Sequence, residues 1–295
     1  MKPFSFSKLV FATLFVLGFA CPTHAGDKVK VVASFSILGD MVKNVGGDRV
    51  EVVELLGPDG DGHTYRPTPA DAKTLAGAKI FFVNGLGFEG WIDRLEKSSG
   101  FQGKKVVATA GVKPRHHGGV DPHAWQRLDN GAIYVTNIRD GLIAADPDGK
   151  ATYEANAKAY LEALEKANAA VKKALDAIPE RRRLVITSHD SFGYFGDAYG
   201  LRFLAPEHVS TESEPSAKDV AKIIRQIRKE QIPAIFMENI TNPVLMKQIS
   251  SDTGATIGGM LYSDALSGPD GPAPTYIDMF KHNIETLTSA LTSSS

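Results

Sequence analysis

The stretch DGKATYEANAKAYLEALEKANAAVKKALDAI, residues 148–178, decides the architecture of this chain. It is rich in Ala, Lys and Glu, and the apolar Leu164 and Val171 recur at helical spacing, so it predicts one long amphipathic helix. Polar Asn168 interrupts the apolar stripe once, and Pro179 ends the helix because proline cannot continue it. Short β-branched runs alternate with helical patterns on both sides, which indicates two α/β halves joined by this helix.

The same alternation fixes the elements expected in each half. In the first half, strands are predicted at residues 29–36, 50–56, 79–83 and 105–108, and helices at 38–45, 91–98 and 129–144, with a short helix opened by Thr68 and Pro69. In the second half, strands are predicted at residues 184–188, 201–204, 234–237 and 256–262, and helices at 192–199, 217–230, 243–253 and 276–291. The sequence therefore predicts an α/β protein of two lobes.

Composition narrows the functional classes. The chain has 295 residues, of which 43% are hydrophobic, enough to bury the core of two lobes. Charged residues, at 23%, match an ordinary globular protein and argue against disorder. The net charge is -1 and no basic stripe is present, so we expect no nucleic-acid partner.

The first 25 residues have the pattern of a secretory signal peptide. Lys2 and Lys8 precede an apolar run at residues 9–20, which is too short to span a bilayer. Residues 23 and 25 are small, as the cleavage site of a signal peptide requires. We therefore expect the mature protein to be periplasmic. Cys21, the only cysteine, is expected to leave with the signal; lipid anchoring through it is the alternative, which the bulky Phe19 disfavours.

Three histidines and one aspartate share a position relative to the predicted strands. They are His63 in GPDGDGHTYRP, His123 in GGVDPHAW, His189 in TSHDSFGYF and Asp264 in LYSDALSG. Loops at the carboxyl ends of strands form the binding crevice of open α/β sheets, and two of these loops fall in each half. Three imidazoles and a carboxylate suit a four-coordinate divalent metal, so these loops are candidates for a metal site between the lobes.

Six segments together resemble one protein family over nearly the whole mature chain. They are GPDGDGHTYRPTPAD, FFVNGLGFEGWIDRL, VDPHAWQRLDNG, TSHDSFGYFGDAYGL, STESEPSAKDV and LYSDALSGPDGPAPTYIDMFKHNIETL. In their order along the chain and their residue patterns, these segments resemble those of the periplasmic zinc/manganese-binding solute-binding proteins of ABC metal importers. The resemblance implies two lobes, each with a roughly four-stranded, mostly parallel sheet flanked by helices, joined by one rigid helix. It also implies that His63, His123, His189 and Asp264 are the metal ligands.

The resemblance further implies a function and a division of the chain. The expected limits are residues 1–25 for the signal peptide, 26–145 for the first metal-binding lobe, 146–179 for the linking helix and 180–295 for the second lobe. The expected function is capture of one Zn²⁺ and delivery to the importer's membrane permease, by a monomer and without any enzymatic reaction. A periplasmic metallochaperone is a further candidate partner. Relatives that carry manganese or iron usually have a carboxylate at the third ligand, where this chain has His189, so zinc is preferred and manganese or a dual carrier is the alternative.

Other residues are candidates for supporting roles. Asn84, Asp121, Asp190 and Glu238 are candidate hydrogen-bond partners of the ligand imidazoles. His116 and His117 lie where zinc-binding relatives often carry a histidine-rich loop, and they either bind metal loosely or form an exposed turn.

Three other functions have less support in the sequence. The G-x-G-x-x-G pattern of residues 85–90 has no acidic residue at the expected distance, so it predicts a tight turn and not a dinucleotide site. A zinc hydrolase would require an open coordination position, which Asp264 closes if it is a ligand. A surface adhesin is a third class, but the sequence contains no adhesive motif.

Overall fold

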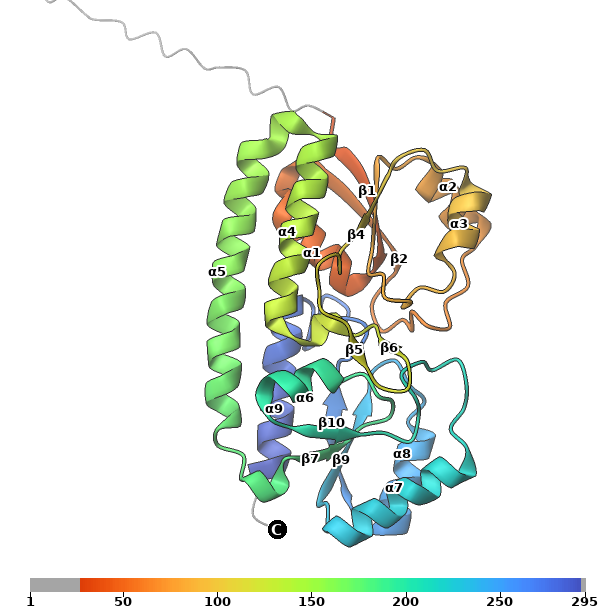
Figure 1. Ribbon diagram of the computed structural model, residues 1–295, viewed down its shortest axis with the longest axis vertical. Coiled ribbons are helices and arrows are strands. Elements are labelled where there is room, and N and C mark those ends of the chain that lie inside the picture. Colours follow the sequence, from red (N-terminus) through yellow and green to blue (C-terminus); the bar gives the residue numbers. More distant parts are fainter. Residues whose placement is uncertain (1–26, 293–295) are drawn as a thin grey trace, which may run out of the picture.

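Two parallel sheets, each of four strands, make up the two lobes of the computed structural model, which describes residues 27–292 (Figure 1). The first sheet has the order β2-β1-β3-β4 and contains β1 (Val29–Phe35), β2 (Val50–Leu56), β3 (Ile80–Val83) and β4 (Lys104–Val107). The second has the order β10-β9-β7-β8 and contains β7 (Leu184–Ile186), β8 (Arg202–Leu204), β9 (Ala234–Glu238) and β10 (Thr256–Leu261). The predicted fold class is confirmed.

Helices cover both faces of each sheet. The first lobe has α1 (Ser36–Gly46), α2 (Pro69–Ala76), α3 (Ile92–Ser99) and α4 (Leu128–Ala145); the second has α6 (Gly193–Tyr199), α7 (Ala217–Glu230), α8 (Val244–Thr253) and α9 (Tyr276–Thr292). Single 3₁₀ turns lie at Gly47–Arg49, Ala124–Gln126, Pro147–Gly149 and Glu180–Arg182. In Figure 1, α2 and α3 lie on the outer face of the first sheet, and α1 and α4 lie on the face towards the long helix α5.

The burial of the strands explains the order of the first sheet. Every residue of β1 except Lys30 is buried, since β1 lies between β2 and β3 and both its faces are covered. At the edge, β4 exposes Lys104 and Lys105, and such charges discourage pairing with another chain.

The long helix α5 (Lys150–Leu175) packs against α1 and α4 of the first lobe and α9 of the second. It ends three residues before the predicted limit, because the guanidinium of Arg183 donates to the carbonyls of Leu175 and Ile178 and stabilises a terminal turn. Asn168, the polar break in the stripe, donates to Asp129 Oδ1 at the start of α4 and accepts from Tyr199 of α6. The break therefore links the two lobes.

The chain crosses between the lobes a second time, after β10. The N–H of Leu266 donates to Ser36 Oγ of α1, and its carbonyl accepts from the N–H of Asp59. The first N–H of α9, from Tyr276, donates to Asp40 Oδ2 of α1 at 3.0 Å. One hydrophobic cluster accordingly runs through both lobes along α5 and α9. The sequence predicted only the crossing through α5.

The predictions about the signal peptide and the membrane concern different parts of the chain. Within residues 27–292, no helix combines the length and the apolar character that crossing a membrane requires. The predicted signal peptide and Cys21 lie outside the described residues, and the lobe limits stay predictions.

Candidate metal centre

The four candidate ligands meet where the carboxyl ends of the two sheets face each other. The ligand atoms of His63, His123, His189 and Asp264 all lie within 4.8 Å of one another, and they form the one group of three or more candidate ligands found among the described residues. Asp264 Oδ2 lies 3.4 Å from Nε2 of His63, 3.5 Å from Nε2 of His123 and 3.3 Å from Nε2 of His189. The Nε2 atoms of His63 and His123 are 3.2 Å apart.

The cluster is buried and lacks ordinary hydrogen-bond partners. His63 is 7% exposed, and the other three side chains are fully buried. Within the described residues, both carboxylate oxygens of Asp264 and Nε2 of His189 have no hydrogen-bond partner. Because unpaired buried polar atoms are costly, this arrangement is one that a bound cation would stabilise.

His63 is held by the loop that follows β2. Its backbone N–H donates to Asp61 Oδ1 at 2.9 Å, and the edge of the Phe88 ring packs against the imidazole with centroids 5.0 Å apart. Gly62 is required because a Cβ there would lie 2.4 Å from Phe88, and its carbonyl accepts from Trp91 Nε1.

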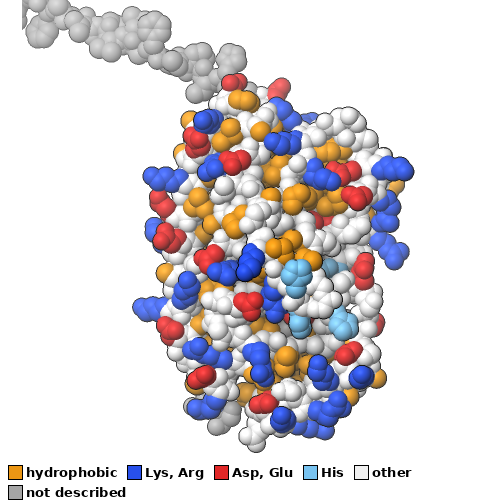
Figure 2. Space-filling model, viewed as in Figure 1, with side chains coloured by type: hydrophobic (Ala, Val, Ile, Leu, Met, Phe, Trp, Pro, Cys, Tyr) orange, Lys and Arg blue, Asp and Glu red, His pale blue; other side chains and the backbone are white. Residues whose placement is uncertain are grey.

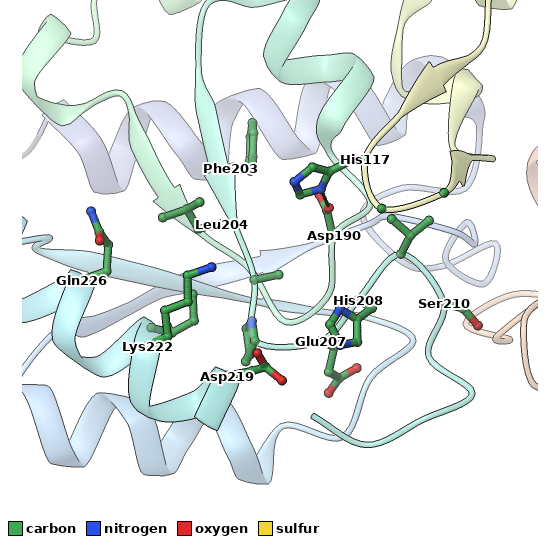
Figure 3. Close-up of a pocket in the computed structure, with 16 residues that line it drawn as sticks. His117, Asp190, Phe203, Leu204, Glu207, His208, Ser210, Asp219, Lys222 and Gln226 are labelled. Carbon is green, nitrogen blue, oxygen red and sulfur yellow. Dashed lines mark hydrogen bonds and ion pairs between the residues drawn. The ribbon is translucent and has the colours of Figure 1, made fainter. Parts of the chain in front are cut away.

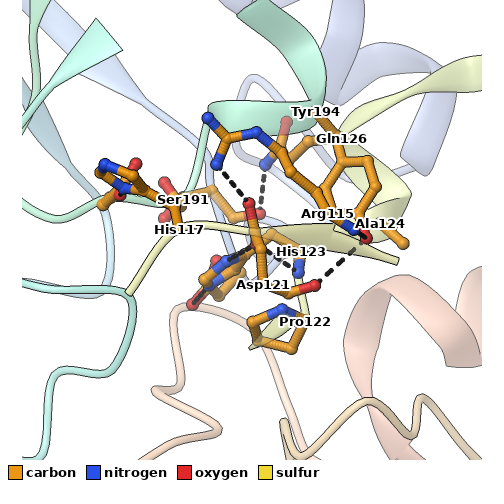
Figure 4. A network of polar contacts seen from close by, with 12 residues as sticks. Arg115, His117, Asp121, Pro122, His123, Ala124, Gln126, Ser191 and Tyr194 are labelled. Carbon is orange, nitrogen blue, oxygen red and sulfur yellow. Dashed lines mark hydrogen bonds and ion pairs between the residues drawn. The ribbon is translucent and has the colours of Figure 1, made fainter. Parts of the chain in front are cut away.

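His123 is oriented by Asp121, two residues earlier. Asp121 Oδ1 accepts from the backbone N–H of His123 at 3.0 Å and lies 2.8 Å from its Nδ1 (Figure 4). With its proton on Nδ1, the ring presents the lone pair of Nε2 to the cluster.

Glu238, at the end of β9, contacts both the backbone and the ring of His189 in a similar arrangement. Glu238 Oε1 accepts from the backbone N–H of His189 at 2.8 Å, and Oε2 lies 2.7 Å from Nδ1. Ser191 Oγ also donates to Oε2, which fixes the carboxylate in place.

Asp264 follows β10, but the first lobe holds its backbone. The carbonyl of the preceding residue, Ser263, accepts from Trp125 Nε1 at 2.8 Å and from Gln126 Nε2 at 2.6 Å. The two donors lie two and three residues after His123, so two ligands from distant parts of the sequence are fixed relative to each other.

The charges in the cluster are coupled. Desolvation lowers the pKa of His63. Burial opposes a charge on His123, but the carboxylates of Asp264 and Asp121 outweigh it and raise the pKa to about 9. Nearby carboxylates likewise raise the pKa of His189, against burial, and the charged imidazoles hold the pKa of Asp264 well below its usual value although burial opposes this. Without metal the cluster holds protons, which a bound cation must displace.

Two of the four candidate supporting residues lie elsewhere than predicted. Asn84 donates to the carbonyl of Pro122 and accepts from Tyr134, so it supports the loop that carries His123 without touching a ligand ring. Asp190 turns away from His189, because its carboxylate lies 2.5 Å from Nδ1 of His117.

His116 and His117 occupy a short antiparallel hairpin formed by β5 (Arg115–His116) and β6 (Val120–Asp121), which the strand pattern did not predict. On the face drawn in Figure 2, histidine side chains gather near the middle, where the lobes meet. His117 and Asp190 lie at one side of a pocket of about 400 Å³, and Lys222 of α7 lies at the other (Figure 3).

The glycine pattern of residues 85–90 forms a turn. Gly85, Leu86 and Gly87 all have positive φ angles, of 87°, 55° and 85°. The buried carboxylate of Glu89 accepts from the backbone N–H groups of Asn84 and Gly85. In a dinucleotide site, such N–H groups would bind a phosphate.

Several residues that build the site were not predicted from sequence patterns, chiefly Asp61, Arg115, Trp125 and Gln126. Asp61 had a signal, because Asp-x-His occurs at both His63 and His123, and in both places the aspartate accepts from the backbone N–H of the histidine. The other three contact groups far away in the sequence, so no local pattern could have revealed them.

Comparisons with known proteins agree with this geometry. The family described as "Zinc-uptake complex component A periplasmic" matches residues 31–290. The manganese-binding lipoprotein MntA of Halalkalibacterium halodurans is 37% identical over 268 residues, which cover 90% of this chain and 89% of MntA. The iron-binding protein YfeA of Yersinia pestis is 34% identical over 272 residues, covering 90% and 87%. The structure of the periplasmic zinc-binding protein TroA of Treponema pallidum matches with a TM-score of 0.87 at 29% identity, covering 90% of this chain and all of TroA, 100%.

Proposed function

Because the chain belongs to the family of periplasmic component A of zinc-uptake complexes, the metal-binding components of ABC importers, we propose that it captures one zinc ion between its lobes and delivers it to an importer's membrane permease. The observation that carries this proposal is the buried cluster of three Nε2 atoms and one carboxylate, in which Nε2 of His189 and both oxygens of Asp264 have no hydrogen-bond partner among the described residues.

The spacing of the ligand atoms supports zinc. Zinc bonds to imidazole and carboxylate are about 2.0–2.2 Å long, so tetrahedral geometry separates the ligand atoms by about 3.3–3.6 Å. Four separations between ligand atoms in the cluster run from 3.2 to 3.5 Å, close to this range, and the remaining pairs lie within 4.8 Å. Three imidazoles also favour zinc over the harder manganese ion.

Manganese, or both metals, is the alternative cargo. MntA is named for manganese and YfeA for iron, so relatives of similar identity carry names of different metals. The ligand set of this chain, with His189 as a third imidazole, is the reason for preferring zinc.

A zinc hydrolase is disfavoured by the position of Asp264. Its Oδ2 lies within 3.5 Å of all three Nε2 atoms and completes a four-ligand set in which only His63 has any exposed surface. A catalytic zinc ion needs an open position for water or substrate. A surface adhesin has no observation in its favour.

We place the protein outside the cytoplasm, where a signal peptide over residues 1–25 would send it. MntA is named a lipoprotein, which gives weight to lipid anchoring through Cys21, although the chain's own Phe19 favours a soluble periplasmic form. The permease of an ABC importer is the proposed partner; loading by a metallochaperone and a monomeric state are further parts of the proposal.

The test is elemental analysis and competitive titration of the purified mature protein, with His189→Ala and Asp264→Ala as variants. We expect one tightly bound zinc per chain that excess manganese does not displace and that both variants weaken by orders of magnitude. Manganese binding of equal strength would replace zinc capture by dual capture. No stoichiometric metal in the wild type would overturn the proposal.

A further inference from the structure

The β5–β6 hairpin of the first lobe is bound to the segment that follows His189 in the second lobe. The hydroxyl of Tyr194 accepts from the backbone N–H of Arg115 at 2.8 Å and donates to the carbonyl of Asp121 at 3.2 Å. The His117–Asp190 pair described above is a third contact between the same two segments. The hairpin ends two residues before His123, so these contacts lie between two ligands of different lobes.

The guanidinium of Arg115 joins the two segments most directly, and Figure 4 shows its contact with Asp121. Its Nη1 donates to Asp121 Oδ2 at 3.1 Å, and its Nε donates to Asp197 Oδ2 of α6 at 3.1 Å. The other oxygen of Asp121 orients His123. The guanidinium lies against Gly193, where a Cβ would come within 2.2 Å of Nη1, so only glycine leaves room for it.

We propose that Arg115 is a positioning residue for metal binding, which holds His123 and His189 at the spacing that a shared ion requires. The inference rests on the metal-capture function proposed above. One path of contacts runs from His123 through Asp121 to Arg115, and from there along α6 back to the segment of His189. Each lobe carries a rigidly held imidazole, and Arg115 fixes the distance between them.

The charges of the site agree with this role. Three carboxylates that touch or face the imidazoles, those of Asp121, Glu238 and Asp264, are almost fully buried. A divalent ion brings two positive charges to these carboxylates, and the guanidinium of Arg115 shares its charge between Asp121 and the exposed Asp197. Arg115 therefore offsets part of the buried negative charge beside the metal site.

An ordinary surface ion pair offers the matched control. Arg127 donates to Asp129 through two nitrogens, but both side chains are exposed, 42% and 50%, and both lie in the first lobe. Such pairs contribute little. Arg115 differs because it is 24% exposed, its partner Asp121 is fully buried, and its second partner belongs to the other lobe.

The experiment measures zinc dissociation by stopped flow into excess chelator, together with zinc affinity, for the full mature chain. The variants are Arg115→Ala, Gly193→Ala and Asp197→Asn, with Arg127→Ala as control. We expect Arg115→Ala to raise the dissociation rate about 10- to 100-fold, the usual effect of losing a group that orients a ligand. Gly193→Ala should act in the same direction, because it displaces the guanidinium yet favours the helix. Arg127→Ala should match the wild type.

Combining variants separates positioning from general loss of stability. If Arg115 acts through Asp197, the double variant Arg115→Ala/Asp197→Asn should release zinc no faster than Arg115→Ala alone, whereas independent structural damage would add. Equal release from Arg115→Ala and Arg127→Ala, or additive effects in the double variant, would overturn the inference. If the wild type binds no stoichiometric zinc, the proposed function itself is refuted. If the wild type binds zinc and Arg115→Ala releases it at the same rate, only the role of Arg115 is refuted.

Discussion

The replacement Glu238→Gln tests how far one buried carboxylate controls the metal site. In the wild type, one oxygen of Glu238 accepts from the backbone N–H of His189 and the other lies 2.7 Å from Nδ1, so both face donors when the proton is on Nδ1. An amide has only one acceptor oxygen. In either orientation its NH₂ group faces a donor, unless His189 moves its proton to Nε2, where the metal must bind.

The size of the effect follows from this conflict. Losing an orienting partner typically costs 10- to 100-fold in metal affinity, or about 1.4–2.8 kcal/mol. Because the substitution keeps the size of the side chain and Ser191 can rotate its hydroxyl to accept, we expect the fold to survive.

The assay is competition for zinc against a chromophoric chelator at pH 7.5, with Glu165→Gln on the exposed face of α5 as control. We expect the control to bind zinc as the wild type does. If Glu238→Gln also binds zinc with unchanged affinity, then the proton of His189 is not set by Glu238, and the reasoning about both oriented rings is wrong.

Three further predictions follow from other contacts. Zinc affinity should fall as the pH is lowered below about 9, because His123 has a pKa of about 9 without metal and must lose its proton to bind; calorimetry in buffers of different ionisation enthalpy should detect that proton. Trp125→Phe should weaken zinc binding about fivefold in the same competition assay, since it removes one hydrogen bond, worth about 1 kcal/mol, to the carbonyl of Ser263. Asp146→Ala should lower the free energy of unfolding by about 1–3 kcal/mol in urea, because it removes a two-point pair with Arg49, and zinc affinity should not change.

The sequence predicted the elements well where a local pattern sets them. The apolar core of β1, the Thr68 cap with Pro69 at the start of α2, and the long helix all follow from residue spacing. The end of α5 does not follow from residue spacing, because it depends on Arg183, which lies beyond the helix and donates to the carbonyls of Leu175 and Ile178. The β5–β6 hairpin is too short for an alternating pattern to register.

The site was predictable in its ligands and less so in their support. The family resemblance identified the four side chains that the structure brings together, whereas their supporting partners depend on distances across the fold. Asp121 and Glu238 contact ligand rings, yet Asp190, adjacent to a ligand in sequence, faces the opposite lobe. Neighbours along the chain point to different sides of a loop, so adjacency alone could not choose between them.

The second crossing of the chain, from β10 through Leu266 to the start of α9, has a mechanical consequence. The long helix α5 and this return to the first lobe, from which α9 leads the chain back, both join the lobes, so a rigid rotation about an axis through both strains neither of them. Such a rotation displaces each group in proportion to its distance from the axis. Asp264 lies beside one crossing and moves least, so an opening motion would first separate His189 from the imidazoles of the other lobe and leave the carboxylate as the last contact with a departing ion.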